Sequence, residues 1–172
     1  MAEHYYSKKP QTKSKPKSWS VTLRDELFQF ETDTGVFSKS EVDFGSRVLI
    51  DAFVMPITEG PVLDVGCGYG PIGLSIAKID ENRTIHMVDI NERAVQLSRK
   101  NAEGNGVQNV RIYESDGLTE VTETDFAAIL TNPPIRAGKQ TIFRFYLDAY
   151  TKLCVGGELW VVIQKKQGAP ST

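Results

Sequence analysis

The sequence of 172 residues has few cysteines and no long apolar run, and each absence excludes a class of protein. Its two cysteines, Cys67 and Cys154, lack the spacing of metal ligands or of a disulfide framework. No apolar run approaches the roughly 18 residues that a membrane-spanning helix needs. The N-terminus is basic but lacks the apolar segment of a secretory signal. We therefore expect a reduced, cytoplasmic protein that makes no membrane contact, in which Cys67 is a small loop residue and not a nucleophile.

The sequence also lacks a strong overall charge. Its net charge of −2 argues against a surface that coats nucleic acid throughout, and its 40% apolar and 24% charged residues are typical of a globular domain. The charge is uneven, because residues 1–19 carry +4 and the remainder carries −6. We predict a basic, poorly ordered arm over residues 1–18 and one domain over residues 19–172. Such an arm is suited to phosphate contact, but a solvated leader has the same composition.

Short apolar runs alternate with helical patterns along most of the chain. Strands that alternate with helices predict an α/β fold with a doubly wound, mostly parallel sheet. We expect its strands at residues 62–65, 84–88, 110–113, 126–131 and 158–163.

Three further patterns flank these strands. Period-two alternation over residues 18–32 predicts an N-terminal β-hairpin that turns at Asp25-Glu26. An amphipathic pattern over residues 142–153 predicts a helix, which Gly156-Gly157 should break. A helix after Ser46 is expected to turn four apolar residues toward the core, namely Val48, Leu49, Ala52 and Phe53.

The fold is organised around the stretch P-V-L-D-V-G-C-G-Y-G-P-I-G at residues 61–73. It reads as a buried strand, a turn with glycines at alternate positions, and a helix that begins with proline. Gly66, Gly68 and Gly70 let the backbone take positive φ and approach a ligand closely, and the helix start presents free N–H groups. Spacing alone leaves a dinucleotide site open, because Gly68, Gly70 and Gly73 fit G-x-G-x-x-G.

Polar residues lie at the ends of four expected strands. Asp64 lies at the mouth of the glycine turn, where a carboxylate would repel a pyrophosphate but attract an ammonium group. Asp89 ends the second sheet strand, where an acid can accept both hydroxyls of a ribose. Asp116 and Asn132 follow the third and fourth strands. Because the carboxyl ends of parallel strands share one edge, we expect these residues at one ligand-binding rim.

The tripeptide Asn132-Pro133-Pro134 suits chemistry on a planar amine. The lone pair of such an amine is delocalised into a π system, and acceptors that hold its N–H bonds out of plane would localise it. The Asn132 side-chain oxygen and the Pro133 carbonyl are suitable acceptors, because proline fixes φ and so aims that carbonyl. If the electrophile is already charged, catalysis needs positioning and electrostatics, and no metal is expected.

The run D-V-G-C-G-Y-G-P-I-G resembles the first motif of the class I S-adenosylmethionine-dependent methyltransferases. The resemblance implies a Rossmann-like fold and a cofactor, S-adenosylmethionine, that carries an ammonium and a sulfonium but no phosphate. In that family the acid after the second strand holds the adenosine ribose, and the acid after the third strand meets the adenine amine. The implied cofactor-binding residues are Asp64, Gly66, Cys67, Gly68, Gly70, Asp89, Ile90, Asp116, Gly117 and Asn132. The family fold continues with a helix and an antiparallel strand pair, which we expect to be missing because residues 165–172 are too few.

Flanking segments resemble a narrower group, the ribosomal small-subunit RNA guanine-N2 methyltransferases. The resemblance implies methyl transfer to the exocyclic amine of a guanine, with ribosomal RNA or the small ribosomal subunit as the partner. It is carried by His4-Tyr5-Tyr6-Ser7, Gly35-Val36-Phe37-Ser38, Asp43-Phe44-Gly45-Ser46 and N-P-P-I-R-A-G-K at residues 132–139. The implied catalytic residues are Asn132, Pro133, Pro134 and Ile135. The implied substrate-binding residues are Phe37, Arg136, Lys139 and Phe143.

One position departs from the pattern, since Ile135 stands where an aromatic residue usually follows Asn-Pro-Pro and stacks on the substrate. Phe37 or Phe143 could take that role. Protein glutamine-amide methyltransferases also use Asn-Pro-Pro, normally with tyrosine next, and remain an alternative. A non-catalytic module that binds the cofactor or RNA is a second alternative, and an oxidoreductase, which would have to bind nicotinamide, is the least supported.

Overall fold

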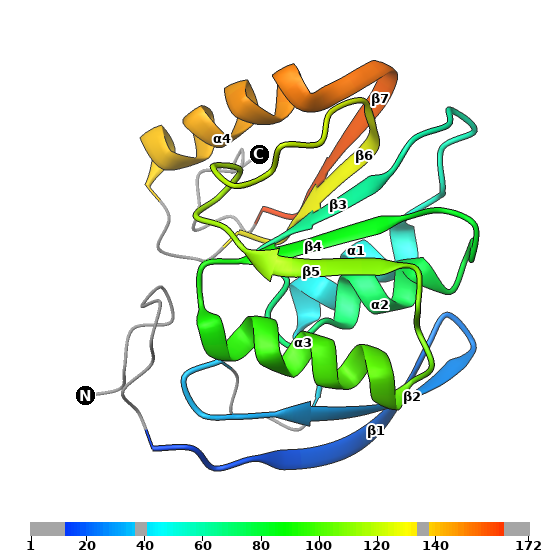
Figure 1. Ribbon diagram of the computed structural model, residues 1–172, viewed down its shortest axis with the longest axis vertical. Helices are drawn as coiled ribbons and strands as arrows, with labels where there is room; N and C mark the ends of the chain where they lie inside the picture. Colours follow the sequence, from blue (N-terminus) through cyan, green and yellow to red (C-terminus); the bar gives the residue numbers. More distant parts are fainter. Residues whose placement is uncertain (1–12, 37–40, 134–137, 164–172) are drawn as a thin grey trace, which may run out of the picture.

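The centre of the fold is a five-stranded parallel sheet (Figure 1). The computed structural model describes residues 13–36, 41–133 and 138–163. In the order β5-β4-β3-β6-β7, the strands are Val110–Glu114, Ile85–Asp89, Val62–Val65, Phe126–Thr131 and Leu153–Val161. Each neighbouring pair is parallel, so the predicted doubly wound sheet is confirmed. The chain winds outward in opposite directions from β3 and β6, and such a switch point is where these sheets bind ligands.

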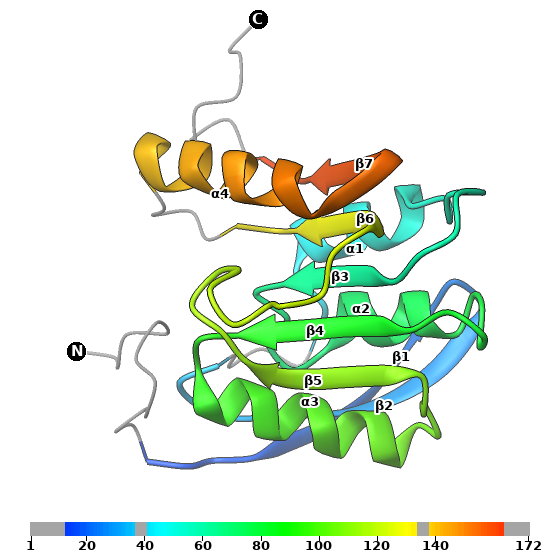
Figure 2. The same ribbon diagram turned by 45° about the horizontal axis from the view of Figure 1, so that its top comes forward.

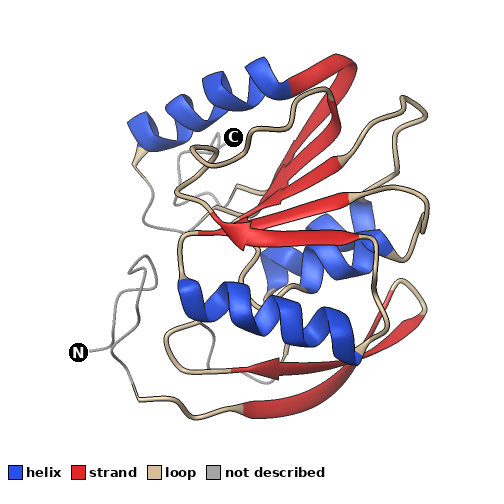
Figure 3. Cartoon of the chain, viewed as in Figure 1, coloured by secondary structure: helices blue, strands red, loops and turns tan. Residues whose placement is uncertain are grey.

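Helices cover both faces of the sheet (Figure 3). They are α1 Phe44–Ala52, α2 Pro71–Ala77, α3 Glu92–Gly104 and α4 Lys139–Lys152. The first three share one apolar core with the hairpin, and Leu49, Leu74 and Val95 contribute to it. On the other side of the sheet from α1, Ala149 of α4 packs in a second core with Phe126 (Figure 2). None of the helices in the described ranges is long and apolar enough to cross a membrane.

The local sequence explains where the central elements begin and end. β3, β4 and β6 are buried at every residue, which is why most of their residues are apolar and none of the three strands alternates between an apolar and a polar face. Pro71 occupies the first turn of α2, where its missing N–H costs nothing. Asn91 caps α3, because its side chain accepts a 3.1 Å hydrogen bond from the N–H of Ala94.

The N-terminal hairpin is formed by β1 Lys17–Leu23 and β2 Glu26–Thr32. Leu23 pairs with Glu26, so the turn is Arg24-Asp25, and the predicted turn one residue later is wrong. Both turn residues have positive φ, 51° and 66°, as a two-residue turn that matches strand twist requires. Arg24 then donates to the carbonyl oxygens of Ile50 and Phe53 at 2.8 and 2.9 Å, which satisfies the carboxyl end of α1.

Two asparagines, one in α3 and one at its C-cap, pair with the edge of β2 as a neighbouring strand would. Asn101 accepts from the N–H of Glu31 and donates to its carbonyl oxygen, at 2.8 and 3.0 Å. One helical turn later, Asn105 makes the same pair of bonds with Gln29, both at 2.9 Å. The i, i+4 spacing on the helix thus matches the i, i+2 spacing on the strand. This pairing fixes the hairpin against α3 and covers a sheet edge.

The tertiary structure corrects two predictions in part. Of the four residues expected to face the core from the first helix, Leu49 and Phe53 are buried as predicted, whereas Val48 is 41% exposed and Ala52 is exposed, and Ile50 is buried in their place. β7 begins at Leu153 directly after α4, and Gly156-Gly157 lie inside the strand where its register with β6 shifts. Gly156 has a φ of 83°, so the glycines make an irregularity in the strand and do not precede it.

Candidate active site

The carboxyl ends of the parallel strands lie along one edge of the sheet (Figure 2), and hydrogen bonds join the turns that follow them. The N–H groups of Gly66 and Cys67 both donate to the Val88 carbonyl at 2.9 Å, which joins the glycine turn to β4. Gly68 N–H donates to the Asp89 carboxylate at 2.9 Å, and the N–H of Ser115 donates to the Asp89 carbonyl at 3.0 Å. The turns after β3, β4 and β5 are therefore one hydrogen-bonded structure.

The glycine turn has the backbone that its sequence predicts. Gly66, Gly68 and Gly70 all have positive φ, at 76°, 59° and 107°. A β-carbon added to Gly66 would meet nothing within 4 Å, as would one added to Gly117 after β5. These two glycines therefore leave open space at the rim, into which a ligand could approach the backbone.

Asp64 is the buried acid of the site. One of its carboxylate oxygens accepts a 3.0 Å hydrogen bond from Gly73 N–H, and the other has no hydrogen-bond partner among the described residues. Burial raises the pKa of Asp64 to about 7, and the charge of Asp89 adds to this, although the Gly73 N–H opposes it. A buried carboxylate with an unsatisfied oxygen calls for a donor or a cation.

Asp89, the acid predicted to bind a ribose, is buried at the end of β4. Its oxygens accept from Gly68 N–H and Asn91 N–H, both at 2.9 Å. A carboxylate oxygen has more than one lone pair, so each can also accept a hydroxyl. Ile90 is half-buried beside it, while Asp116 and Gly117 are exposed after β5. The acids of the second and third sheet strands thus lie where a ligand across the strand ends would reach them.

Cys67 is buried inside the glycine turn. Its sulfur lies 3.5 Å from the hydroxyl oxygen of Ser98, and that hydroxyl donates to the Gly68 carbonyl at 2.7 Å. Burial raises the pKa of the Cys67 thiol well above its ordinary value, and the charges of Asp89 and Asp64 act in the same direction. The thiol therefore stays protonated and packs as a small loop residue.

Asn132 follows β6, directly across the switch point from the glycine turn. Thr131 pairs with Val65, and its hydroxyl donates to the Val65 carbonyl at 3.0 Å. The side-chain nitrogen of Asn132 donates to the Asp43 carboxylate and to the Ser46 hydroxyl oxygen, both at 3.0 Å. Its side-chain oxygen makes no hydrogen bond to the described residues.

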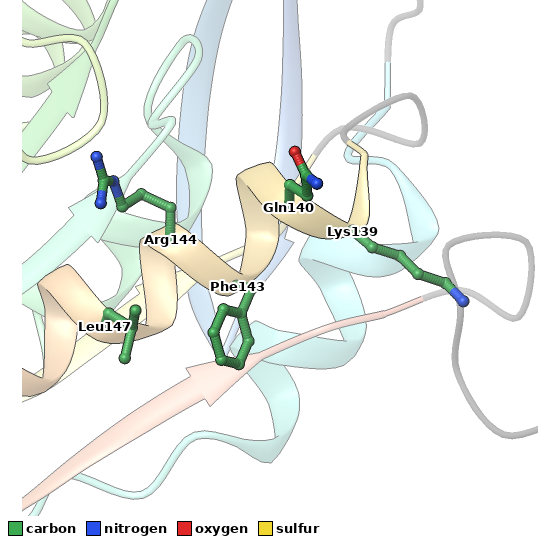
Figure 4. Close-up of a pocket in the computed structure, with 5 residues that line it drawn as sticks. All are labelled: Lys139, Gln140, Phe143, Arg144 and Leu147. Carbon is green, nitrogen blue, oxygen red and sulfur yellow. The ribbon is translucent and has the colours of Figure 1, made fainter.

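Two predicted substrate residues lie on α4, beside a hollow on the surface. Its described lining comprises Lys139, Gln140, Phe143, Arg144 and Leu147. Figure 4 shows Phe143 and Leu147 on one side of the helix, with Gln140 and Arg144 on the other. In the part of the chain that the structure describes, neither Lys139 nor Phe143 makes a hydrogen bond or ring contact with Asn132. Pro133 is half-buried. Phe37, Pro134, Ile135 and Arg136 lie outside the described residues.

Sequence reasoning missed several residues that hold the site in place. Asp43 and Ser46 contact Asn132, and Asn101 donates to the Tyr69 carbonyl in the glycine turn at 2.8 Å. Asn91 donates to the Gly35 carbonyl at 3.0 Å, which ties the segment after the hairpin to the rim. Asp43 and Ser46 belong to a segment that carries the family resemblance, and an aspartate just ahead of an apolar helix is a signal that could have identified the cap, but no local pattern connects either residue to Asn132.

These residues fit S-adenosylmethionine. The unsatisfied oxygen of Asp64 suits an ammonium donor, Asp89 suits ribose hydroxyls, and Gly66 and Gly117 leave room beside the backbone. A doubly wound sheet with a glycine turn and acids at the ends of β3 and β4 is the arrangement of a class I S-adenosylmethionine-dependent methyltransferase. Residues 27–172 match the model of the family described as "Methyltransferase small domain", and the chain belongs to this family.

Known proteins resemble the chain over different shares of their length. YbxB of Bacillus subtilis (strain 168), described as uncharacterized, is 60% identical over 99% of this chain and 86% of its own length. "Ribosomal RNA small subunit methyltransferase C" of Vibrio parahaemolyticus is 38% identical over 73% of this chain and 36% of its own length.

A solved structure agrees in fold and cofactor. The Thermus thermophilus 16S rRNA N2 G1207 methyltransferase (RsmC), in complex with AdoMet and guanosine, matches with a TM-score of 0.76 and 27% identity. The match covers 88% of this chain and 43% of that one. The chain therefore spans less than half of both the Vibrio and the Thermus proteins. Together with the family, this match identifies S-adenosylmethionine as the cofactor.

Proposed function

We propose that this protein transfers a methyl group from S-adenosylmethionine to the exocyclic amine, N2, of a guanine in small-subunit ribosomal RNA. The observation that carries the proposal is the hydrogen bonding of Asn132. Its side-chain nitrogen is engaged by two acceptors of α1, and its oxygen is the atom left to accept a hydrogen bond from the target amine. This acceptor follows β6, next to the strand that carries Asp64.

When bound, S-adenosylmethionine supplies an electrophilic methyl group: a carbon–nitrogen bond forms as the carbon–sulfur bond breaks, the electron pair goes to sulfur, and the amine releases a proton to water. The contribution of the chain is positioning and electrostatics. Asn132 Oδ1 and the Pro133 carbonyl would accept hydrogen bonds from the N–H groups of the amine and would orient its lone pair for attack. The amine attacks through the lone pair that these acceptors orient, so the chain needs no strong base for the first step.

The names of similar proteins support the substrate. The Vibrio relative is a ribosomal RNA small subunit methyltransferase, and the Thermus structure contains guanosine beside AdoMet. Lys139 and Phe143, at the first turns of α4, would then contact RNA phosphate and base, respectively. Pro134, Ile135, Arg136 and Phe37 keep the roles that the resemblance implies.

The test is methylation of ribosomal RNA in vitro. Small-subunit RNA and assembled small subunits from a strain that lacks the protein are incubated with enzyme and S-adenosylmethionine, digested to nucleosides and analysed by mass. An increase in N2-methylguanosine supports the proposal. No increase with either substrate would overturn the RNA assignment, and methylated glutamine in the ribosomal proteins, detected by mass analysis of their peptides, would point to amide methylation instead.

Asn132→Ala separates chemistry from folding. We expect it to abolish turnover and to leave cofactor affinity within about twofold, because the cofactor residues of β3 and β4 are untouched. The control is Asn82→Ala, since Asn82 is exposed in the connection between α2 and β4. Loss of cofactor binding together with turnover would assign Asn132 a structural role.

A further inference from the structure

The orientation of the Asn132 amide is set by residues outside the Asn-Pro-Pro tripeptide. We infer that Asp43 is a positioning residue, whose carboxylate binds the Asn132 side-chain nitrogen and so leaves the side-chain oxygen as the acceptor for the target amine. The inference rests on the proposed function, because it assigns the orientation a purpose in recognising a guanine amine.

Asp43 does two things with one oxygen atom. As the N-cap of α1, its Oδ2 accepts from the backbone N–H of Ser46 at 3.2 Å. The same oxygen accepts from Asn132 Nδ2 at 3.0 Å. The second acceptor for that nitrogen is the Ser46 hydroxyl, also at 3.0 Å. The start of α1 thus contacts a residue that lies 89 positions later in the chain.

Chemistry makes Asp43 the decisive partner. The two ends of a side-chain amide have nearly the same shape, so packing alone does not choose between its orientations. A carboxylate can only accept, so a reversed amide would place its oxygen against the Asp43 oxygen. A hydroxyl can donate or accept, and Ser46 would tolerate either orientation. Asp43 therefore sets the orientation and Ser46 strengthens it.

The helix that carries Asp43 is itself held in place. Arg24 binds the carbonyl oxygens of Ile50 and Phe53 at the far end of α1. Ser46, Leu49 and Ile50 are buried against the core. The carboxylate is therefore presented from a fixed element, as a residue that orients a catalytic side chain should be.

The orientation has a consequence for specificity. With its nitrogen bound to Asp43, Asn132 has its oxygen left to accept a hydrogen bond, which favours a base that carries an amine. A reversed amide would have its nitrogen left to donate, and the amine of the base would meet another donor. Loss of the Asp43 acceptor should therefore reduce both turnover and the preference for guanine over hypoxanthine, which lacks the exocyclic amine.

Two substitutions of Asp43 separate capping from orientation. Asp43→Asn and Asp43→Ser both keep a good N-cap, so the stability of α1 should be similar in the two variants. The asparagine oxygen that caps Ser46 N–H also reaches Asn132, whereas the serine side chain is one atom shorter. We expect turnover within about threefold of the wild type for Asp43→Asn and about 10- to 100-fold lower for Asp43→Ser.

The hydroxyl is tested in the same way. Ser46→Ala is expected to reduce turnover less than Asp43→Ser does, because the carboxylate still selects the orientation. Ser75→Ala is the matched control: Ser75 is similarly buried, but its hydroxyl donates to the Pro71 carbonyl within α2.

The ratio of guanosine affinity to inosine affinity is a readout that a general loss of structure would not change, because such a loss weakens the binding of both nucleosides. The wild-type protein and each variant, saturated with S-adenosylhomocysteine to prevent turnover, are titrated with guanosine and with inosine. We expect the wild type and Asp43→Asn to prefer guanosine by about fivefold or more, and Asp43→Ser to bind the two nucleosides about equally. Melting temperature and S-adenosylhomocysteine affinity are measured on the same samples.

The outcomes distinguish the two proposals. If Asp43→Ser keeps the wild-type preference for guanosine, or weakens both nucleosides equally while its melting temperature falls, the positioning role is wrong and the proposed function stands. If the wild type shows no preference and ribosomal RNA gains no N2-methylguanosine, the proposed function fails and this inference fails with it.

Discussion

Gly45 lies directly against the side-chain amide of Asn132. A β-carbon added at Gly45 would be 2.9 Å from Asn132 Oδ1 and 3.0 Å from its Nδ2, closer than such contacts occur in proteins. Gly45 is in the first turn of α1, where its φ is not positive, so the residue is not needed for backbone conformation. The absence of a β-carbon at Gly45 leaves room for the side-chain amide of Asn132.

Gly45→Ala should therefore reduce activity without destabilising the protein. Alanine is about 1 kcal/mol more favourable than glycine in a helix, and the displaced group is the end of a side chain that can rotate. We expect the melting temperature to be unchanged or slightly higher and the turnover to fall by at most about 10-fold. Thermal denaturation and single-turnover kinetics check this. A large loss of stability would mean that Asn132 cannot move.

Asp64 predicts a pH dependence of stability in the absence of cofactor. Its pKa is about 7 in the folded protein, above the ordinary value of 3.8, so the folded state binds a proton more tightly than the unfolded chain. The stability that Asp64 contributes is therefore fully present below pH 3.8 and is lost as the pH rises through about 7. When the pH is raised from about 5 to about 8, we expect the ionisation of Asp64 to lower the free energy of unfolding by about 2–3 kcal/mol.

The isosteric Asp64→Asn variant isolates this effect from other titrating groups. His86, for example, has a pKa lowered by burial and contributes in the opposite direction. Urea denaturation of both proteins at the two pH values gives the difference between their slopes. Equal pH dependence of wild type and variant would show that the Asp64 carboxylate is satisfied in the free protein.

Asn101 and Asn105 form a matched pair for testing how the hairpin supports the glycine turn. Both bind β2, but only Asn101 also donates to the Tyr69 carbonyl. Asn101→Ala removes three hydrogen bonds at a buried site and should cost about 2–4 kcal/mol, against about 1 kcal/mol for the partly exposed Asn105→Ala. Cofactor affinity should fall in Asn101→Ala and stay near the wild type in Asn105→Ala. Equal affinities would mean that the hairpin does not hold the turn.

Lys139 predicts a salt dependence of RNA binding. It is exposed at the first position of α4 and lines the surface hollow there. If it contacts phosphate, Lys139→Gln should weaken binding and reduce the slope of log affinity against log salt by about one. Lys152→Gln, at the other end of α4, serves as the control. Identical slopes for both variants would place RNA elsewhere on the surface.

The positions of the main elements could be predicted because local signals were strong. β6 is apolar up to its last residue and has the predicted bounds of residues 126–131, and β3 is apolar on both sides of Asp64. Asn91 was identifiable as a cap from its place before an apolar stripe. The hairpin turn was placed one residue late because its register depends on Phe28 and Phe30 packing inward, which local turn preferences do not encode.

The sequence by itself determined the winding of the sheet, the glycine turn and the presence of polar residues at the carboxyl ends of its strands. Periodicity and glycine spacing act over a few residues, so they can be read locally. Only the tertiary structure decided that Asp64 keeps an unsatisfied oxygen and that Asp43 holds Asn132. These properties arise because folding buries one carboxylate and brings another beside an amide 89 residues away, and no local pattern records either event.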